Sequence, residues 1–275
     1  MPNSDTITMQ VPDETDDFAE LLRKIERERS VPCAGYKDRC LRRRVGVRMR
    51  ATGMHTFPDY ARLLDTASGE WEKLLAALTI NVTRFFRDDA VFAALENQAY
   101  PLLRETFSGT LDVWSAGCSH GQEPYSLAMG LAETVGVERF RIEATDVDVG
   151  SMAATRAASY PELIAGEIPA ERRARWMNPG DPAVVKSELR ARVQVLRHDL
   201  LRDVMPVQRF HLICCRNVII YFSREAQATL FDQLYNALMP GGILVLGKVE
   251  TLIGPARDKF AALNLRERLF RRPLA

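Results

Sequence analysis

A glycine-containing loop between an apolar run and a helical pattern is the feature that most constrains the fold. Residues 111–133 read LDVWSAGCSHGQEPYSLAMGLAE. The apolar run Leu111–Trp114 predicts a buried strand, and the small residues after it predict a tight loop. A helical pattern follows, with Leu127 and Leu131 on one face. Strand, glycine loop and helix in this order are typical of the opening unit of a nucleotide-binding α/β sheet.

The loop lacks the common phosphate-binding motifs. Gly117 and Gly121 are spaced as Gly-x-x-x-Gly, which is neither a dinucleotide fingerprint nor a phosphate loop. Both glycines would allow the backbone to approach a ligand closely. Glu123 follows the loop, and Asp146 follows the next apolar run, 140–144. Two carboxylates at successive strand ends would repel phosphate and suit ribose hydroxyls or a cation, which indicates an adenosyl sulfonium. The alternative is that both acids are solvated helix starts.

Three sequence segments, the glycine loop among them, point to one family. They are WSAGCSHGQEPYSLAM, INVTRFFRDDAVF, and FHLICCRNVIIYF continuing to LMPGGILVLGKVETL. In this order they resemble the chemotaxis receptor methyltransferases of the CheR family, which use S-adenosylmethionine to esterify receptor glutamates. The resemblance runs from Gly35 to the C-terminus. It implies a protein-glutamate O-methyltransferase with S-adenosylhomocysteine as product and the methylation helices of a chemoreceptor as partner.

The sequence divides into three parts. Residues 1–15 are polar and are predicted to be disordered, and residues 16–87 are predicted to be a helical domain and linker without strands. Residues 88–275 are predicted to be the methyltransferase domain. The expected fold class is α/β, a Rossmann-like doubly wound sheet with an N-terminal all-α domain. Expected helices are 16–29, 36–50, 57–64, 70–78, 88–98 and one from Asp146 to 159, and a further helix follows Ser223 through Leu238. Expected strands after the first are 141–144, 193–196, 210–214, 243–246 and an antiparallel edge strand, 266–270.

Composition limits the possible partners and locations. The 37 basic and 36 acidic residues leave a net charge of +1, so no global field attracts nucleic acid. No apolar run reaches the ~18 residues needed to span a bilayer, and the N-terminus has no signal-peptide core. We therefore expect a cytoplasmic protein without membrane insertion, and a monomer. Five cysteines without a CxxC pair predict neither a disulfide framework nor a zinc site.

The helix expected at 36–50 carries the one local basic patch of the chain. The family resemblance implies that this patch docks the acidic methylation helices of a receptor. A solvated face and a contact with nucleic acid are the alternatives. The residues assigned to receptor docking are Arg39, Arg42, Arg43, Arg44 and Arg48.

The segment 81–87 is expected to close the site from the N-terminal side. The resemblance places Asn81, Thr83 and Arg87 over the cofactor. The guanidinium of Arg87 can donate two parallel hydrogen bonds to a carboxylate, such as that of an incoming glutamate. The alternative is that Arg87 forms a surface ion pair with an adjacent aspartate. Since two adjacent phenylalanines, 85 and 86, cannot both face one core from a helix, one of them is expected to wall the ligand cleft.

The remaining site residues follow other strands. The resemblance places Asp199 and Leu200 at the adenine ring, and it makes Arg216 and Asn217 cofactor contacts. The hydroxyl of Tyr221 is directed at the methyl group or the incoming carboxylate, unless Tyr221 is a buried tyrosine with a satisfied hydroxyl. Together with Gly117, Glu123 and Asp146 these residues complete the predicted site, with Arg87 and Tyr221 as the catalytic pair. The family pattern is not kept at His120, Gln122, Asp199, Lys248 and Thr251.

Esterification of a glutamate places few chemical demands on the protein. The carboxylate is ionised at neutral pH and needs no base, so neither a catalytic triad nor a metal is expected. Opposite charges cancel as the bond forms, which a water-poor cleft favours. Two other readings stay open: a catalytically weak regulator that binds cofactor or receptor, and a methyltransferase for another carboxylate.

Overall fold

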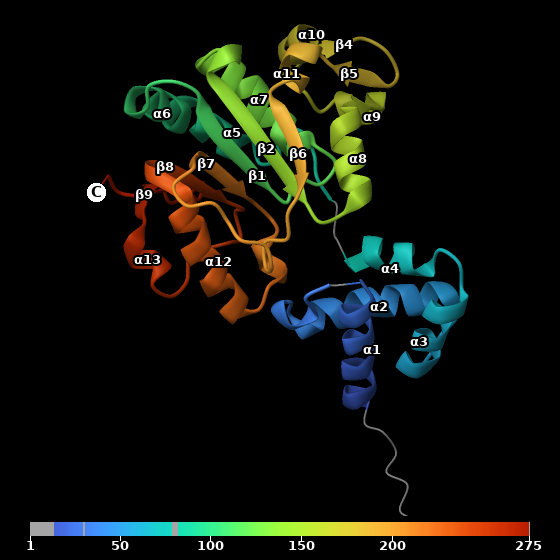
Figure 1. The fold of residues 1–275 in the computed structure, drawn as a ribbon. Coiled ribbons are helices and arrows are strands. Elements are labelled where there is room, and N and C mark those ends of the chain that lie inside the picture. Colours follow the sequence, from blue (N-terminus) through green and yellow to red (C-terminus); the bar gives the residue numbers. More distant parts are fainter. Residues whose placement is uncertain (1–13, 30, 79–81, 275) are drawn as a thin grey trace, which may run out of the picture. The chain divides into compact units, whose positions relative to one another are not determined.

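The computed structural model describes residues 14–29, 31–78 and 82–274 (Figure 1). The chain forms two compact units, Met1–Thr79 and Ile80–Ala275. The residues expected to link two domains, 82–87, therefore belong to the second unit. The predicted site residue Asn81 and most of the predicted disordered segment lie outside the described residues.

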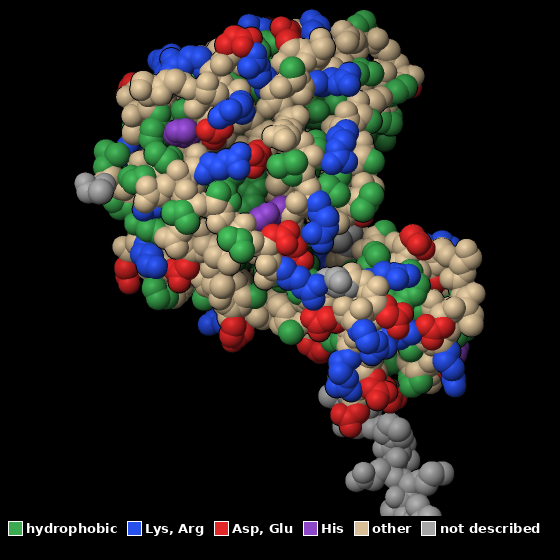
Figure 2. Space-filling view, in the orientation of Figure 1, with side chains coloured by type: hydrophobic (Ala, Val, Ile, Leu, Met, Phe, Trp, Pro, Cys, Tyr) green, Lys and Arg blue, Asp and Glu red, His purple; other side chains and the backbone are tan. Residues whose placement is uncertain are grey.

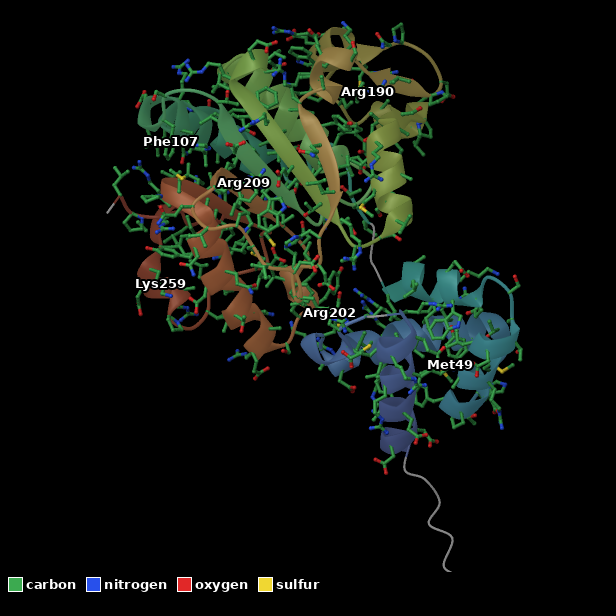
Figure 3. All side chains as sticks on the ribbon, viewed as in Figure 1. Met49, Phe107, Arg190, Arg202, Arg209 and Lys259 are labelled. Carbon is green, nitrogen blue, oxygen red and sulfur yellow. The ribbon has the colours of Figure 1, made fainter. Side chains whose placement is uncertain are left out.

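The first unit is helical, as expected. Its helices are α1 (Glu14–Arg29), α2 (Asp38–Thr52), α3 (Phe57–Thr66) and α4 (Glu70–Leu78), with a 3-10 turn at Cys33–Gly35. The side chain of Thr56 caps α3 by accepting a hydrogen bond from the amide of Asp59, and Gly53 ends α2 at a φ of +70°. The buried stripes of these helices form one core, in which Met49 of α2 lies (Figure 3).

The second unit is built on a seven-stranded sheet. Its order is β6-β2-β1-β7-β8-β10-β9. Five neighbouring strands are parallel, and β10 and β9 are antiparallel additions. Since the strand order reverses between β1 and β7, the prediction of a doubly wound sheet is confirmed. The strands are β1 (Leu111–Ala116), β2 (Phe140–Asp146), β6 (Val193–Arg197), β7 (Phe210–Cys215), β8 (Leu238–Leu246), β9 (Ala261–Asn264) and β10 (Leu269–Arg271).

Two expected elements at the end of the chain were wrong in their bounds. The helix expected to run through Leu238 ends at Ala237, and β8 begins at Leu238, before Gly241. The predicted edge strand at 266–270 is shifted to β10, which is antiparallel as expected but lies between β8 and β9. The outer strand is β9, whose short sequence AALN has no alternating pattern to reveal it.

Helices cover both faces of the sheet (Figure 1). The expected helix 88–98 is split into α5 (Asp89–Ala94) and a π-helical turn, Leu95–Ala99. Asp146 does not start a helix: it is the last residue of β2, and Asp148 caps the helix that follows. The remaining helices are α6 (Tyr100–Thr106), α7 (Gln122–Thr134), α8 (Val149–Ala157), α12 (Arg224–Ala237) and α13 (Ala256–Lys259), with 3-10 turns at Val137–Arg139 and Ile219–Tyr221.

The core of this unit follows the alternation of the strands. Val113 of β1, Leu212 of β7 and Val245 of β8 pack in one buried cluster with α7. Trp114, one residue along from Val113, points to the opposite face and stacks on Phe210 at 5.1 Å between ring centroids. Both faces of the parallel strands are therefore buried, which leaves the carboxyl ends of the strands for polar residues.

An insertion lies between α8 and β6. A three-stranded antiparallel sheet forms there, in the order β3-β5-β4. Arg172 fastens it to the main body through Glu96 and Glu133, at 2.8 Å each. Its elements are β3 (Ser159–Tyr160), α9 (Glu162–Ala165), α10 (Ala170–Trp176), β4 (Met177–Asn178), β5 (Ala183–Val185) and α11 (Ser187–Arg190).

Charges of both signs are mixed over the surface. On the face shown in Figure 2, Lys and Arg side chains alternate with Asp and Glu side chains in each unit, in agreement with the net charge of +1. None of the described helices is long and apolar enough to cross a membrane.

Candidate functional site

The loop between β1 and α7 is fastened to the end of β2. The backbone amides of Gly117 and Cys118 both donate to the carbonyl oxygen of Thr145, each at 2.9 Å. The amide of Ser119 donates to Oδ2 of Asp146, also at 2.9 Å. The predicted glycine loop and the predicted acid of β2 are thus brought to the same edge of the sheet.

The two glycines of this loop serve different purposes. Gly117 has a φ of +81°, and a Cβ there would lie 2.5 Å from Cγ2 of Val218 in the loop after β7. A Cβ on Gly121 would lie 2.7 Å from the hydroxyl of Tyr160, in the insertion. The space that a Cβ would need at either glycine is therefore filled by protein, and the expectation that the backbone of this loop approaches a ligand stays a prediction.

Glu123 lies at the start of α7 and is bonded from two sides. Ser115 donates to its Oε1 at 2.7 Å, and Nη1 of Arg216 donates to its Oε2 at 3.2 Å. Burial raises the pKa of the Glu123 carboxyl, and the charge of Arg216 and the hydrogen bond from Ser115 oppose that shift. Glu123 is thus not the solvated helix start of the alternative reading.

Arg216 is buried and joins two segments far apart in the sequence. Its side chain is 2% exposed. Nη2 donates to the carbonyl oxygen of Arg87 at 2.7 Å and to Oδ2 of Asp88 at 3.0 Å, while Nη1 holds Glu123. Nη1 and Nη2 of Arg216 thus position the residues around it, and the assignment of Arg216 as a cofactor contact stays a prediction.

The segment before α5 is held in an unusual backbone conformation. Phe86 and Asp88 have φ values of +50° and +63°, which non-glycine residues rarely adopt. The amide of Phe86 donates to Oγ of Ser126, and the amide of Phe85 donates to a carboxylate oxygen of Glu167, both at 2.9 Å. A strained backbone conformation of this kind persists only where surrounding contacts hold it in place, and such conformations are concentrated at functional sites.

Both adjacent phenylalanines lie in one core, so the premise that they cannot share a core is wrong. Phe86 nevertheless also lines a pocket, together with Asp89 and Glu167. The segment is not helical, and the positive φ of Phe86 turns both rings inward. Phe85 packs edge-on against Tyr160 at 4.8 Å, and Phe86 against Phe92 at 5.1 Å.

Arg87 extends from this segment and is partly exposed. Its Nη1 donates to the carbonyl oxygen of Val82 at 2.9 Å. Asp88 pairs with Arg216 and Asp89 lies 3.7 Å from Arg84, so the alternative ion pair of Arg87 with an adjacent aspartate does not form. Thr83 is half-buried in the same segment.

Asp146 and Asp199 follow neighbouring strands. Besides the amide of Ser119, Asp146 accepts the amides of Val147 and Asp148 at 2.8 and 3.0 Å. Burial raises its pKa, and these backbone hydrogen bonds lower it in part. Asp199 is 6% exposed and its Oδ1 accepts the amide of Leu201, while Leu200 is also 6% exposed.

Asn217 and Tyr221 lie in the loop after β7. Asn217 has a φ of +62°, and Tyr221 ends the 3-10 turn and is half-buried. This loop is held by a residue to which the sequence analysis gave no role, Glu250, whose carboxylate accepts the amides of Asn217 and Ile220 at 3.0 and 3.3 Å. An acid a few residues after a buried strand was the available signal, the same one that singled out Asp146.

The basic helix α2 is less exposed than its sequence pattern suggests. Arg44 is 4% exposed and donates to the carbonyl oxygen of Leu78, so its assignment to a docking surface is wrong. Arg48 forms a two-pronged pair with the buried Glu70, at 3.0 and 2.8 Å. Arg42 pairs with Asp38 and stacks over the ring of Phe18. The exposed arginines of the helix are Arg39, Arg43 and Arg50.

The donor set fits an adenosyl sulfonium. Two acids, Glu123 and Asp146, stand at the carboxyl ends of β1 and β2, where an open parallel sheet binds its ligands. The described residues contain no cluster of acids, histidines and cysteines that could hold a metal ion. A doubly wound sheet with such an edge and no phosphate loop is the arrangement expected of the S-adenosylmethionine-dependent methyltransferases.

Comparison with known families assigns the chain within this class. Residues 16–79 match the all-alpha domain of the CheR methyltransferases, and residues 81–269 match the SAM-binding domain of the same family. The chain therefore belongs to the CheR methyltransferase family, and S-adenosylmethionine is its cofactor.

Individual relatives agree over most of their length. The chain is 33% identical over 255 residues to a chemotaxis protein methyltransferase of Listeria monocytogenes, covering 92% of this chain and 97% of the relative. It is 32% identical over 248 residues to chemotaxis protein methyltransferase 1 of Pseudomonas aeruginosa, covering 85% of this chain and 89% of the relative.

Proposed function

We propose that this protein transfers a methyl group from S-adenosylmethionine to glutamate side chains of methyl-accepting chemotaxis receptors. The observation that carries the proposal is the joint match of both units to one family whose named relatives are chemotaxis protein methyltransferases. The presence of both Arg87 and Tyr221 supports turnover over the reading of a catalytically weak regulator.

The proposed roles follow from side-chain chemistry. The cofactor supplies the methyl group from its sulfonium. Arg87, partly exposed and held by a strained segment, orients the incoming carboxylate through its planar fork. Tyr221 directs its hydroxyl at the same carboxylate or at the methyl group. The carboxylate is ionised at neutral pH, so none of these residues needs to act as a base.

The proposed binding groups divide between cofactor and receptor. Gly117, Glu123, Asp146, Asp199, Leu200 and Asn217 surround the cofactor, together with Asn81 and Thr83. In the first unit, the exposed arginines of α2 dock the acidic methylation helices of the receptor. That surface consists of the exposed Arg39 and Arg43, with the half-buried Arg42 beside them. It does not include Arg44, which is buried, or Arg48, whose guanidinium is paired with Glu70.

The test combines binding with group transfer. Calorimetric titration with S-adenosylhomocysteine is followed, in the same preparation, by labelled methyl transfer to a receptor cytoplasmic fragment. A methyl ester of glutamate releases methanol in base. Binding with base-labile label supports the proposal. Binding without label shifts the assignment to the regulator or to another carboxylate substrate, and no binding overturns it.

A further inference from the structure

Glu250 is a buried acid without a cationic partner. It lies four residues past the end of β8 and is 4% exposed. Its carboxylate accepts three backbone amides, those of Gly247, Asn217 and Ile220, at 2.6, 3.0 and 3.3 Å. Within the described part of the chain, no lysine or arginine forms an ion pair with it. Acids buried to this degree are normally paired with a cation, so this one is held by amide dipoles alone.

Keeping a carboxylate in this place is costly. Burial raises the pKa of the Glu250 carboxyl, and the backbone hydrogen bonds from Asn217, Gly247 and Ile220 recover only part of that cost. A residue that is expensive to bury and does not complete an ion pair indicates a task other than stability.

Through its hydrogen bonds, Glu250 connects the loop after β7 with the end of β8. A Cβ on Gly247 would lie 2.7 Å from Oε2 of Glu250 and 2.9 Å from the amide nitrogen of Asn217. Only glycine leaves room for this arrangement. The loop after β7 is thereby pressed against the end of β8, with Asn217 at a φ of +62°.

The loop that Glu250 holds touches the other side of the site as well. Val218, the residue after Asn217, fills the space beside Gly117 in the loop after β1. The 3-10 turn that follows ends at Tyr221, whose amide donates to the carbonyl oxygen of Val218 at 3.2 Å. The position of Tyr221 is therefore set by a five-residue segment whose backbone is fixed at Asn217 and Ile220.

We propose that Glu250 is a positioning residue for methyl transfer, which fixes the segment 217–221 and so places the hydroxyl of Tyr221 for the substrate carboxylate. This rests on the proposed function only in the part that concerns Tyr221. In Glu250→Gln, one of the two acceptor oxygens becomes an NH₂ group that faces amide donors, so the segment loses part of its anchor.

The test compares wild type, Glu250→Gln, Tyr221→Phe and the double variant. We expect Glu250→Gln to lower kcat about tenfold, with a smaller change in the affinity for S-adenosylhomocysteine, since of the proposed cofactor residues only Asn217 is released while Glu123 and Asp146 are untouched. In the double variant, Glu250→Gln should add little to the loss caused by Tyr221→Phe, because both changes remove the same placed hydroxyl. Full additivity of the two losses, or wild-type kcat in Glu250→Gln, would overturn the proposal.

A second measurement does not depend on the substrate. Amide hydrogen exchange should rise at residues 217–221 in Glu250→Gln and stay unchanged elsewhere in the sheet. The matched control is Glu267→Gln, another buried acid of the same unit, which lies 3.8 Å from Lys248 and does not contact this loop. Unchanged exchange at 217–221 refutes the anchoring role, even if the receptor is not the substrate. If the glutamine variant fails to fold, Glu250→Asp replaces it in the test. Aspartate keeps the negative charge, but its side chain is one methylene shorter, so amide exchange at residues 217–221 should rise in the same way.

Discussion

Nη1 of Arg216 lies 3.2 Å from Oε2 of Glu123, and the arginine side chain that makes this contact is 2% exposed. The same guanidinium holds the carbonyl oxygen of Arg87 and the carboxylate of Asp88. One buried cation thus connects the start of α7 with the segment that presents Arg87, so its loss should affect both folding and chemistry.

For Arg216→Met, we expect a loss of about 3–5 kcal/mol of stability, because Glu123, whose side chain is 13% exposed, and the partly exposed Asp88 lose their cationic partner. Turnover should fall as well, since the carbonyl of Arg87 is released. Thermal or urea unfolding measures the first effect and methyl transfer the second. The matched control is Arg209→Met. Arg209, labelled in Figure 3, is 47% exposed and pairs with Glu143, so its loss should cost less than about 1 kcal/mol. Equal losses in both variants would contradict this reading of the Arg216 contacts.

The contact between Gly117 and Val218 gives a second prediction. In Gly117→Ala, the new methyl group meets Cγ2 of Val218 at 2.5 Å, and alanine is strained at a φ of +81°. Overpacking and backbone strain together should cost about 2–5 kcal/mol and weaken cofactor binding. Gly136→Ala separates the two effects, because φ there is +96° but no atom lies near the added Cβ.

Adding Val218→Ala to Gly117→Ala should restore part of the loss. Unfolding midpoints and calorimetry with S-adenosylhomocysteine measure the outcome. If Gly136→Ala is as harmful as Gly117→Ala, the close approach of Val218 is not the cause.

Arg87 should matter for turnover more than for cofactor binding. For Arg87→Ala we expect a fall in methyl transfer on the order of 10²-fold or more, because the carboxylate loses its planar partner. S-adenosylhomocysteine should still bind, though more weakly. Arg84→Ala is the matched control, since Arg84 lies in the same segment, is 54% exposed and forms an ion pair with Asp89 at 3.7 Å. Normal turnover in Arg87→Ala would sink the role assigned to this residue.

The exposed arginines of α2 should govern receptor affinity. Reversing two charges in Arg39→Glu with Arg43→Glu should raise KM for the receptor fragment about tenfold and leave kcat nearly unchanged. The effect should shrink at high salt, because exposed charges are screened. The control is the equivalent double reversal on α1, Arg23→Glu with Arg27→Glu, both exposed in the same unit. A similar rise of KM in the control would assign the effect to net charge and not to this surface.

Glu70 links the stability of the first unit to pH. Burial acts to raise the pKa of its carboxyl, but the hydrogen bonds from Arg48 and Tyr60 outweigh it and leave the pKa below its usual value. A carboxyl with a lowered folded pKa contributes stability above its unfolded pKa of 4.5, and that contribution is lost as pH falls through the folded pKa.

For Glu70→Gln, we therefore expect a loss of about 2–4 kcal/mol at neutral pH that diminishes toward zero below pH ~4. Amide hydrogen exchange in α2 and α4 measures the effect locally. Glu72→Gln makes the same chemical change at an exposed position of the same helix and should show little effect at any pH. A difference between wild type and Glu70→Gln that persists undiminished in acid would exclude this linkage.

The sequence by itself determined the fold class and brought the proposed cofactor residues to one edge of the sheet. Apolar runs such as Phe210–Cys214 bury both faces of a strand, so their length and their polar ends are visible in the sequence. The glycine loop follows β1, Asp146 ends β2, and Glu123 starts the helix after the loop, so all three lie close to a strand end. Contacts between residues close to a strand end need no long-range information.

Only the tertiary structure decided which polar residues remain available to a ligand. Arg216 and Arg44 look like free cations in the sequence. As whole residues, however, they are only 6% and 4% exposed, and each donates a hydrogen bond to a residue far away in the chain. Glu250 gains its role from amides that lie 33 and 30 residues upstream. A buried charge is stable only when other groups of the protein supply its hydrogen bonds. Which groups lie next to it depends on the packing of distant segments and cannot be read from the neighbouring sequence.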